Sequence, residues 1–81
     1  MTSELAFGRV LQRLRKEKKL SQEDLAFSSQ LNRVFISRLE NGHRRPTINT
    51  IIRLSRALGI SASMIVAEVE EMLEDGGRPA I

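Results

Sequence analysis

The chain has 81 residues, one histidine and no cysteine, which limits it to a single domain with a small core and argues against disulfide bridges and zinc sites. So small a core buries little apolar surface, and we expect further burial in a subunit interface. The net charge of +3 is polarised, because residues 1–60 hold 12 Lys and Arg against 5 Asp and Glu, whereas residues 61–81 hold one Arg against 5 acids.

The first helix is predicted over residues 4–18. Its apolar face has the i, i+3, i+4, i+7 spacing of a helix and consists of Phe7, Val10, Leu11 and Leu14. The opposite face is strongly basic. The basic run at residues 15–19 is most simply a solvated surface that adds generic attraction for phosphates.

A second, short helix is predicted over residues 22–28. Ser21 can act as its N-cap, since a serine hydroxyl accepts a backbone N–H at a helix start. Asp24 lies three residues later and completes a weak capping box.

The third helix, residues 33–41, is predicted to begin after the N-cap Asn32 and to end at Gly42, a residue type that closes helices in the left-handed conformation. Its core face consists of Ile36 and Leu39. The outward face carries Arg33, Val34, Ser37, Arg38 and Asn41. Such guanidinium, hydroxyl, amide and apolar groups are those that contact base edges. Phe35 lies at the boundary between the faces, where core packing and DNA contact are both open.

A fourth helix is predicted after the basic loop Arg44-Arg45-Pro46. Thr47 can cap its start and Gly59 stops it. The side chains expected to point inward are Ile48, Ile51, Leu54, Ser55 and Leu58.

A fifth helix is predicted from Ser61 to residue 74, and residues 75–81 are predicted to form a flexible tail because they contain Asp-Gly-Gly-Arg-Pro. This helix has more apolar side chains than one buried face can use. We expect one set to seal the core and a second set to pack on a partner across a two-fold axis. The predicted dimer contacts are Val66, Val69 and Leu73, and the alternative is a single broad core face.

Membrane insertion and secretion are not expected. The longest uninterrupted apolar stretch, residues 64–67, is far shorter than the roughly 20 residues that a membrane span requires. Residues 1–8 carry an acid and lack the basic region and apolar block of a secretory signal. We therefore expect a cytoplasmic protein.

These elements predict an all-α fold, with residues 1–74 forming one domain. Two short helices joined by a turn and followed by a basic loop are typical of a helix-turn-helix. In that motif the second helix enters the DNA major groove with its polar face, and the first helix holds it in position.

Five segments occur in a characteristic order within residues 7–60: LR at 14–15, LSQEDLA at 20–26, ISRLENG at 36–42, RPT at 45–47 and ALGI at 57–60. In this combination they resemble the Cro/C1-type helix-turn-helix family, also called the XRE family. The resemblance implies a five-helix, lambda-repressor-like DNA-binding domain with the motif at helices 2 and 3. It also implies a transcriptional regulator that binds a pseudo-palindromic double-stranded operator as a homodimer.

The resemblance assigns roles to individual residues. It implies base reading by Arg33, Val34, Ser37 and Arg38, with Arg33 bidentate to guanine and Val34 against a thymine methyl group. It implies phosphate contacts by Gln22, Asn41, Arg44 and Arg45. Arg15 and Glu40 match a pair that forms an internal salt bridge in many family members, which is a structural role.

The turn before the third helix departs from the family pattern. The family usually has Gly or Asn at the residue that adopts a positive φ, and the aligned residue here is Gln30. A side chain in that conformation costs on the order of 1 kcal/mol. The strain is tolerable, but it leaves the insertion angle of the third helix open.

The chain is also similar to controller proteins of restriction–modification systems in its short length, its Leu31-Asn32-Arg33 segment and its apolar last helix. Such controllers activate and later repress their own gene. A generic or phage-type repressor is an equally good interpretation of these features.

Two other functional classes fit the sequence less well than a DNA-binding regulator does. An antitoxin or other protein-interaction module would favour apolar residues where this chain has Arg33, Arg38, Arg44 and Arg45. An enzyme is not indicated, because the sequence shows no nucleophile paired with a base, no phosphate-binding glycine loop and no separated acid pair. We expect no cofactor, no metal and no small-molecule ligand, and we assign no role to His43.

Overall fold

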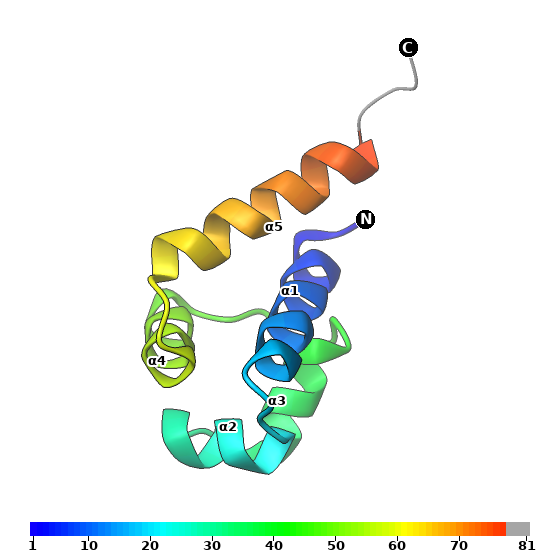
Figure 1. Cartoon of the computed structure of the whole chain (residues 1–81). Helices are drawn as coiled ribbons and strands as arrows, with labels where there is room; N and C mark the ends of the chain where they lie inside the picture. Colours follow the sequence, from blue (N-terminus) through cyan, green and yellow to red (C-terminus); the bar gives the residue numbers. More distant parts are fainter. Residues whose placement is uncertain (78–81) are drawn as a thin grey trace.

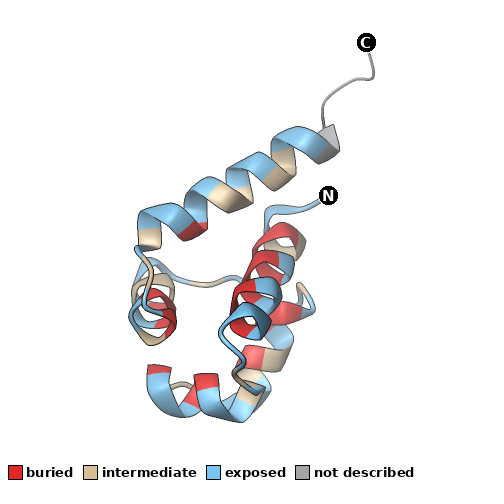
Figure 2. Cartoon of the chain, in the orientation of Figure 1, coloured by how far each residue is buried: buried red, intermediate tan, exposed pale blue. Residues whose placement is uncertain are grey.

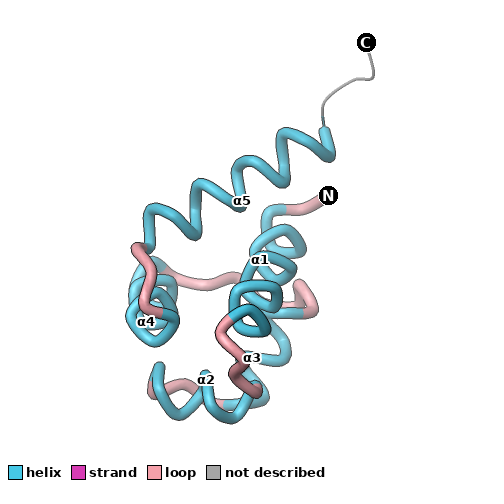
Figure 3. The backbone as a smooth tube through the Cα atoms, in the orientation of Figure 1, coloured by secondary structure: helices cyan, strands magenta, loops and turns pink. Residues whose placement is uncertain are grey.

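The computed structural model describes residues 1–77, which form five helices and no strand. The helices are α1 (Ser3–Glu17), α2 (Gln22–Ser29), α3 (Arg33–Glu40), α4 (Ile48–Leu58) and α5 (Ala62–Gly77), joined by short loops (Figure 3). The predicted all-α class and the order of the five helices are confirmed.

Helices α2, α3 and α4 begin after Ser21, Asn32 and Thr47, the polar residues that the sequence marked as caps. At α2, Ser21 Oγ accepts the Asp24 N–H at 3.0 Å and Asp24 Oδ2 accepts the Ser21 N–H at 2.9 Å, so the capping box is formed. The hydrogen bond from the Ser21 N–H lowers the pKa of the Asp24 carboxyl. Asn32 Oδ1 accepts the Val34 N–H at 2.7 Å, and Thr47 Oγ1 accepts the Thr50 N–H at 3.1 Å.

Left-handed residues separate the helices. Gln30 ends α2 at φ 58° and ψ 38°, the conformation expected for this position. Gly42 and Gly59 follow α3 and α4 at φ 76° and 71°. Lys19, between α1 and α2, also has a positive φ of 59°, which nothing in the sequence suggested.

The core lies where one face of each helix meets the others (Figure 2). Helix α1 contacts α3 and α5, α2 contacts α3 and α4, and α4 contacts α5. The buried apolar side chains at the centre include the expected faces of α1 and α3 and are Phe7, Val10, Leu11, Leu14, Leu25, Ala26, Ile36, Leu39, Leu54, Leu58 and Ile65. Because α3 buries one side against α1 and α2, its other side is left to solvent.

The prediction that Ile48 points inward is wrong. Its side chain is 74% exposed, whereas Thr50, which was not expected in the core, is buried. At about 100° per residue Ile48 lies about 120° around the helix from Leu54, which points into the core. The first turn of α4 therefore presents an isoleucine to solvent.

The fifth helix is longer than predicted. It continues through Gly77, so residues 75–77 are helical, although the sequence assigned them to a tail. The two glycines lower helix propensity but do not exclude the helical conformation. The rest of the predicted tail, residues 78–81, lies outside the described residues.

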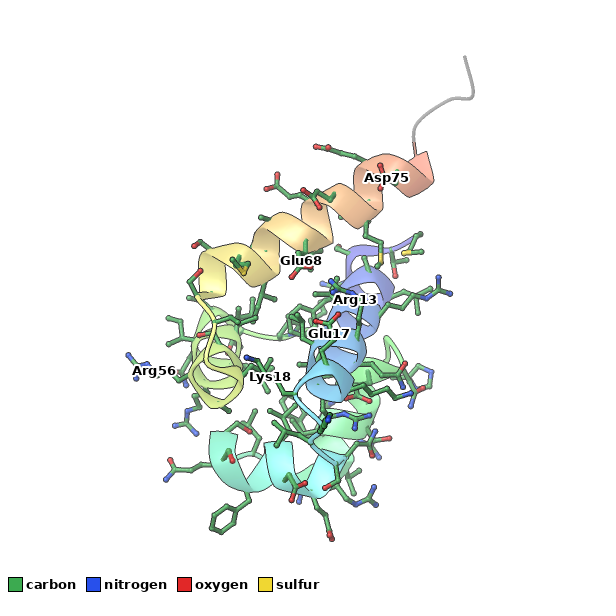
Figure 4. All side chains as sticks on the ribbon, viewed as in Figure 1. Arg13, Glu17, Lys18, Arg56, Glu68 and Asp75 are labelled. Atoms are coloured by element: carbon green, nitrogen blue, oxygen red, sulfur yellow. The ribbon has the colours of Figure 1, made fainter. Side chains whose placement is uncertain are left out.

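Helix α5 lies across α1 and α4, at the end of the molecule opposite α2 (Figure 1). Arg13 of α1 links the two helices, because it forms an ion pair with Glu68 of α5 (Figure 4). It also pairs at 3.0 Å with Glu17 of its own helix. These hydrogen bonds, the one with Glu68 above all, raise the pKa of the Arg13 guanidinium. Within residues 1–77 no single helix has the length and apolar character to cross a membrane; α4 and α5 meet that measure only jointly, across a 106° bend.

Candidate nucleic-acid interface

One side of α3 is exposed along its whole length. Arg33, Val34, Arg38 and Asn41 are exposed and Ser37 is half-buried, while Ile36 and Leu39 are completely buried. Val34 is 47% exposed although it is apolar, so it is available for contact with a partner. The structure thus brings the four predicted base-reading side chains onto one helix, around its solvent-facing side.

Helix α2 supports α3 from behind. Leu25 and Ala26 are buried, and the Leu31 N–H donates to the Ala26 carbonyl oxygen at 2.9 Å across the turn. This hydrogen bond and the left-handed Gln30 close the α2 C-terminus and set the direction in which the chain enters α3.

Arg15 and Glu40 form a buried ion pair between α1 and the last turn of α3. Arg15 Nε lies 2.6 Å from Glu40 Oε2, and Nη2 donates to Oε1 at 3.0 Å. The two side chains are only 9% and 1% exposed. Arg15 Nη1 also donates to the Leu20 carbonyl oxygen at 2.8 Å. The hydrogen bonds with Glu40 raise the pKa of the Arg15 guanidinium, which favours its charged form.

Gln22 extends this pair to the surface. Its Nε2 donates to Glu40 Oε1 at 3.1 Å, and its Oε1 accepts a hydrogen bond from Arg33 Nη1 at 3.3 Å. A continuous chain of polar contacts therefore runs from Arg15 through Glu40 and Gln22 to Arg33. No sequence pattern indicated that Gln22, the expected phosphate contact, and Arg33, the expected base reader, would touch each other.

The loop after α3 gathers the remaining predicted phosphate contacts. Asn41 Nδ2 donates to the Ser37 carbonyl oxygen at 2.9 Å, which directs the side chain back along α3. The Arg44 guanidinium lies 6.0 Å from the centre of the Phe35 ring, a cation–π contact. Phe35 is half-buried and packs against the core, so its packing role is realised.

Arg45 has an acidic partner that the sequence did not reveal. Its Nε donates to Glu4 Oε2 at 2.7 Å, while its side chain is 86% exposed. These two residues belong to the α3–α4 loop and the first turn of α1, and no local pattern connects them.

The predicted dimer contacts lie on and beside a groove. Val66 is 42% exposed, and Val69 and Leu73 are half-buried, with Val69 partly packed against the core. Val66 and Val69 line a groove of about 550 Å³ whose other lining residues are apolar, Phe7, Pro46 and Ile51, or polar, Ser3, Glu4 and Arg45. Other exposed apolar side chains were missed from the sequence, among them Phe27 on α2, Ile48 on α4 and Met64 on α5. The excess of apolar residues on α4 was the signal that could have revealed Ile48.

The chain is similar to known helix-turn-helix proteins in sequence and in structure. The helix-turn-helix family model matches residues 11–65. An uncharacterised HTH-type transcriptional regulator, y4dJ of Sinorhizobium fredii, is 39% identical over 64 residues, covering 79% of this chain and 83% of that protein. The control protein C.MunI of a Mycoplasma species is 38% identical over 68 residues, covering 83% and 92% of the two chains. The crystal structure of the restriction-modification controller protein C.AhdI from Aeromonas hydrophila is similar with a TM-score of 0.74 at 39% identity, over 75% of this chain and 92% of that one.

Proposed function

The chain belongs to the helix-turn-helix family of transcriptional regulators, and on this premise we propose that it binds a pseudo-palindromic double-stranded operator, sequence-specifically, as a homodimer. The observation that carries the proposal is the face of α3, where Arg33, Val34 and Arg38 are exposed, whereas Ile36 and Leu39 on the opposite face are completely buried. A helix with this division can enter the major groove without uncovering the core.

In the proposed complex the start of α3 reads bases. Arg33 would form a bidentate contact with guanine O6 and N7, and Val34 would meet a thymine methyl group. Ser37 and Arg38 would contact bases further along the groove. The hydrogen bond between Arg33 and Gln22 supports this assignment, because it limits the orientations of the guanidinium at the start of the helix.

Residues around the reading helix would hold the phosphates. Gln22 lies in the first turn of α2, where the backbone N–H groups and the helix dipole attract an anion. Asn41, Arg44 and Arg45 would hold the backbone on the other side of the groove, which positions the protein without reading sequence. Because a DNA-binding regulator acts in the compartment that holds the DNA, we include the expected cytoplasmic location in the proposal.

The proposed dimer forms through α5 and the adjacent turn of α4. Val66, Val69 and Leu73 would pack on a second copy, and Ile51 of α4 lines the same groove as Val66 and Val69. Two copies related by a two-fold axis would place their α3 helices about 34 Å apart, in successive major grooves on one side of the duplex.

A narrower proposal is that this regulator controls a restriction–modification system. C.MunI is a control protein, C.AhdI is a restriction-modification controller, and each is similar to this chain over at least three quarters of its length. The proposal requires genes for a methyltransferase and an endonuclease beside the gene for this chain. A gene neighbourhood without them would favour a repressor of another kind.

Arg33→Ala tests the reading face. We expect the free energy of operator binding to become less favourable by about 1 to 3 kcal/mol, because guanine would lose a bidentate contact. The preference for one base at that position should be relaxed. Binding would be measured by fluorescence anisotropy on an operator selected from random duplexes, at several salt concentrations. The matched control is Arg56→Ala, which removes an arginine from α4 that points away from α3 (Figure 4).

An equal loss of affinity on every sequence would reassign Arg33 to the phosphates. If affinity for DNA were unmeasurable, or did not fall with rising salt, the DNA-binding proposal itself would fail, because phosphate neutralisation releases counterions. Unmeasurable DNA binding, or DNA binding that does not weaken with salt, would favour the protein-interaction module.

Val66→Glu tests the dimer. We expect the dimer dissociation constant to rise at least about tenfold, since a carboxylate would be buried without a partner. Analytical ultracentrifugation measures this constant. The control is Ala67→Glu, an exposed position on α5 about 100° around the helix from Val66. An unchanged dissociation constant for Val66→Glu, or an equal rise for both variants, would remove Val66 from the interface.

A further inference from the structure

The basic loop after α3 contacts an acidic side chain in the first turn of α1. Arg45 Nε donates to Glu4 Oε2 at 2.7 Å, although the two residues are 41 positions apart. Glu4 also lines a hollow of about 520 Å³ together with Phe35, Arg44 and Thr47. A negative charge is therefore fixed among the side chains that we assign to the DNA backbone.

Contacts other than Arg45 also favour the charged form of Glu4. The main cause of its lowered pKa is a hydrogen bond from its own backbone N–H, and the hydrogen bond from Arg45 comes second. Ser3 Oγ donates to Glu4 Oε1 at 3.3 Å, and the residue lies in the first turn of α1, where the helix dipole favours an acid. The carboxylate would keep its charge if the guanidinium left.

Arg45 is the partner that can leave. Its side chain is 86% exposed, against 25% for Glu4, and the ion pair is held by a single hydrogen bond. Ion pairs this open to water are weak, because solvent screens the attraction and ordering a long side chain costs entropy. A phosphate close to the loop can therefore compete for the guanidinium.

We propose that Glu4 is an intramolecular competitor of DNA for Arg45, pairing with the guanidinium in the free protein and giving it up to a backbone phosphate on binding. The inference rests on the proposed DNA-binding function and adds to it a residue that lowers affinity. Phosphates are the same in every sequence, so the competition weakens binding to operator and random DNA alike.

Glu4→Gln measures the competition. The variant is expected to bind a short mixed-sequence duplex about two- to five-fold more tightly than the wild type, the factor that corresponds to an exposed ion pair. Glu17→Gln is the matched control, because it makes the same change of charge on the same helix but next to Arg13 (Figure 4). Circular dichroism of each variant checks that the helices are unchanged.

A double-mutant cycle assigns the gain to Arg45. In an Arg45→Ala background, Glu4→Gln should add no more affinity than Glu17→Gln does. The inference is overturned if Glu4→Gln leaves or lowers the affinity, if Glu17→Gln gives an equal gain, or if the gain persists without Arg45. Wild-type protein that bound no DNA would overturn the proposed function as well, whereas each of the other results leaves that function standing.

Discussion

Glu40→Ala is expected to lower the free energy of unfolding by about 3 to 5 kcal/mol. The Glu40 side chain is 1% exposed and accepts hydrogen bonds from both Arg15 and Gln22. Its removal would leave the Arg15 guanidinium charged, buried and without its counter-ion. A domain of this size has a total stability of about 5 to 15 kcal/mol, so the variant would have little margin left. Urea unfolding followed by circular dichroism measures the loss.

The double variant Arg15→Met/Glu40→Leu separates the cost of an unpaired charge from the value of the pair. Attraction inside a buried pair is largely offset by the desolvation of both groups, so apolar replacements of similar size should recover most of the lost stability. The exposed acid Glu23 provides a control, since Glu23→Ala should cost only a few tenths of a kcal/mol. A loss below about 1 kcal/mol for Glu40→Ala would show that Arg15 finds another partner or reaches water.

Gly8→Val is expected to destabilise the fold by about 3 kcal/mol or more, because α1 and α3 touch at this residue. A Cβ at position 8 would lie 2.4 Å from the Leu39 carbonyl oxygen and 2.6 Å from that of Glu40. Both atoms belong to the α3 backbone, so the helices would have to separate. Valine is only slightly better than glycine in a helix, and little helix propensity would offset the clash.

The control for this variant is Gln12→Val, which places the same side chain at an exposed position of α1. It should change the free energy of unfolding by less than about 0.5 kcal/mol. We further expect Gly8→Val to weaken operator binding in any protein that remains folded, since α3 would be displaced from α1. Wild-type stability of Gly8→Val would mean that the helices can move apart freely, contrary to their close contact.

The features that the sequence predicted well depend on residues near one another in the chain. The capping box of α2 needs only Ser21 and Asp24, three residues apart, and the core face of α3 follows from Ile36 and Leu39 on consecutive turns. Because side-chain spacing alone fixes the buried face of a regular helix, the outward direction of Arg33 followed as well.

Contacts between distant segments could not be predicted in the same way. Nothing in the composition of α1 indicates that Gly8 touches the α3 backbone or that Glu4 reaches Arg45. The pairing of Arg15 with Glu40 was anticipated only because the family supplies it. The position of Ile48 was misjudged because an apolar residue at the end of an inward stripe can lie beyond the edge of the core.

The contacts that link Arg33 to Gln22 and Glu40 bear on any attempt to retarget the protein. Replacing Arg33 alone with a side chain suited to another base would leave the Gln22 amide oxygen without its donor, so that the hydrogen bond to Glu40 alone would orient the amide. Positions 22 and 33 are therefore a single unit for redesign, and libraries that vary them together should yield altered operator preference more often than libraries that vary the reading helix alone.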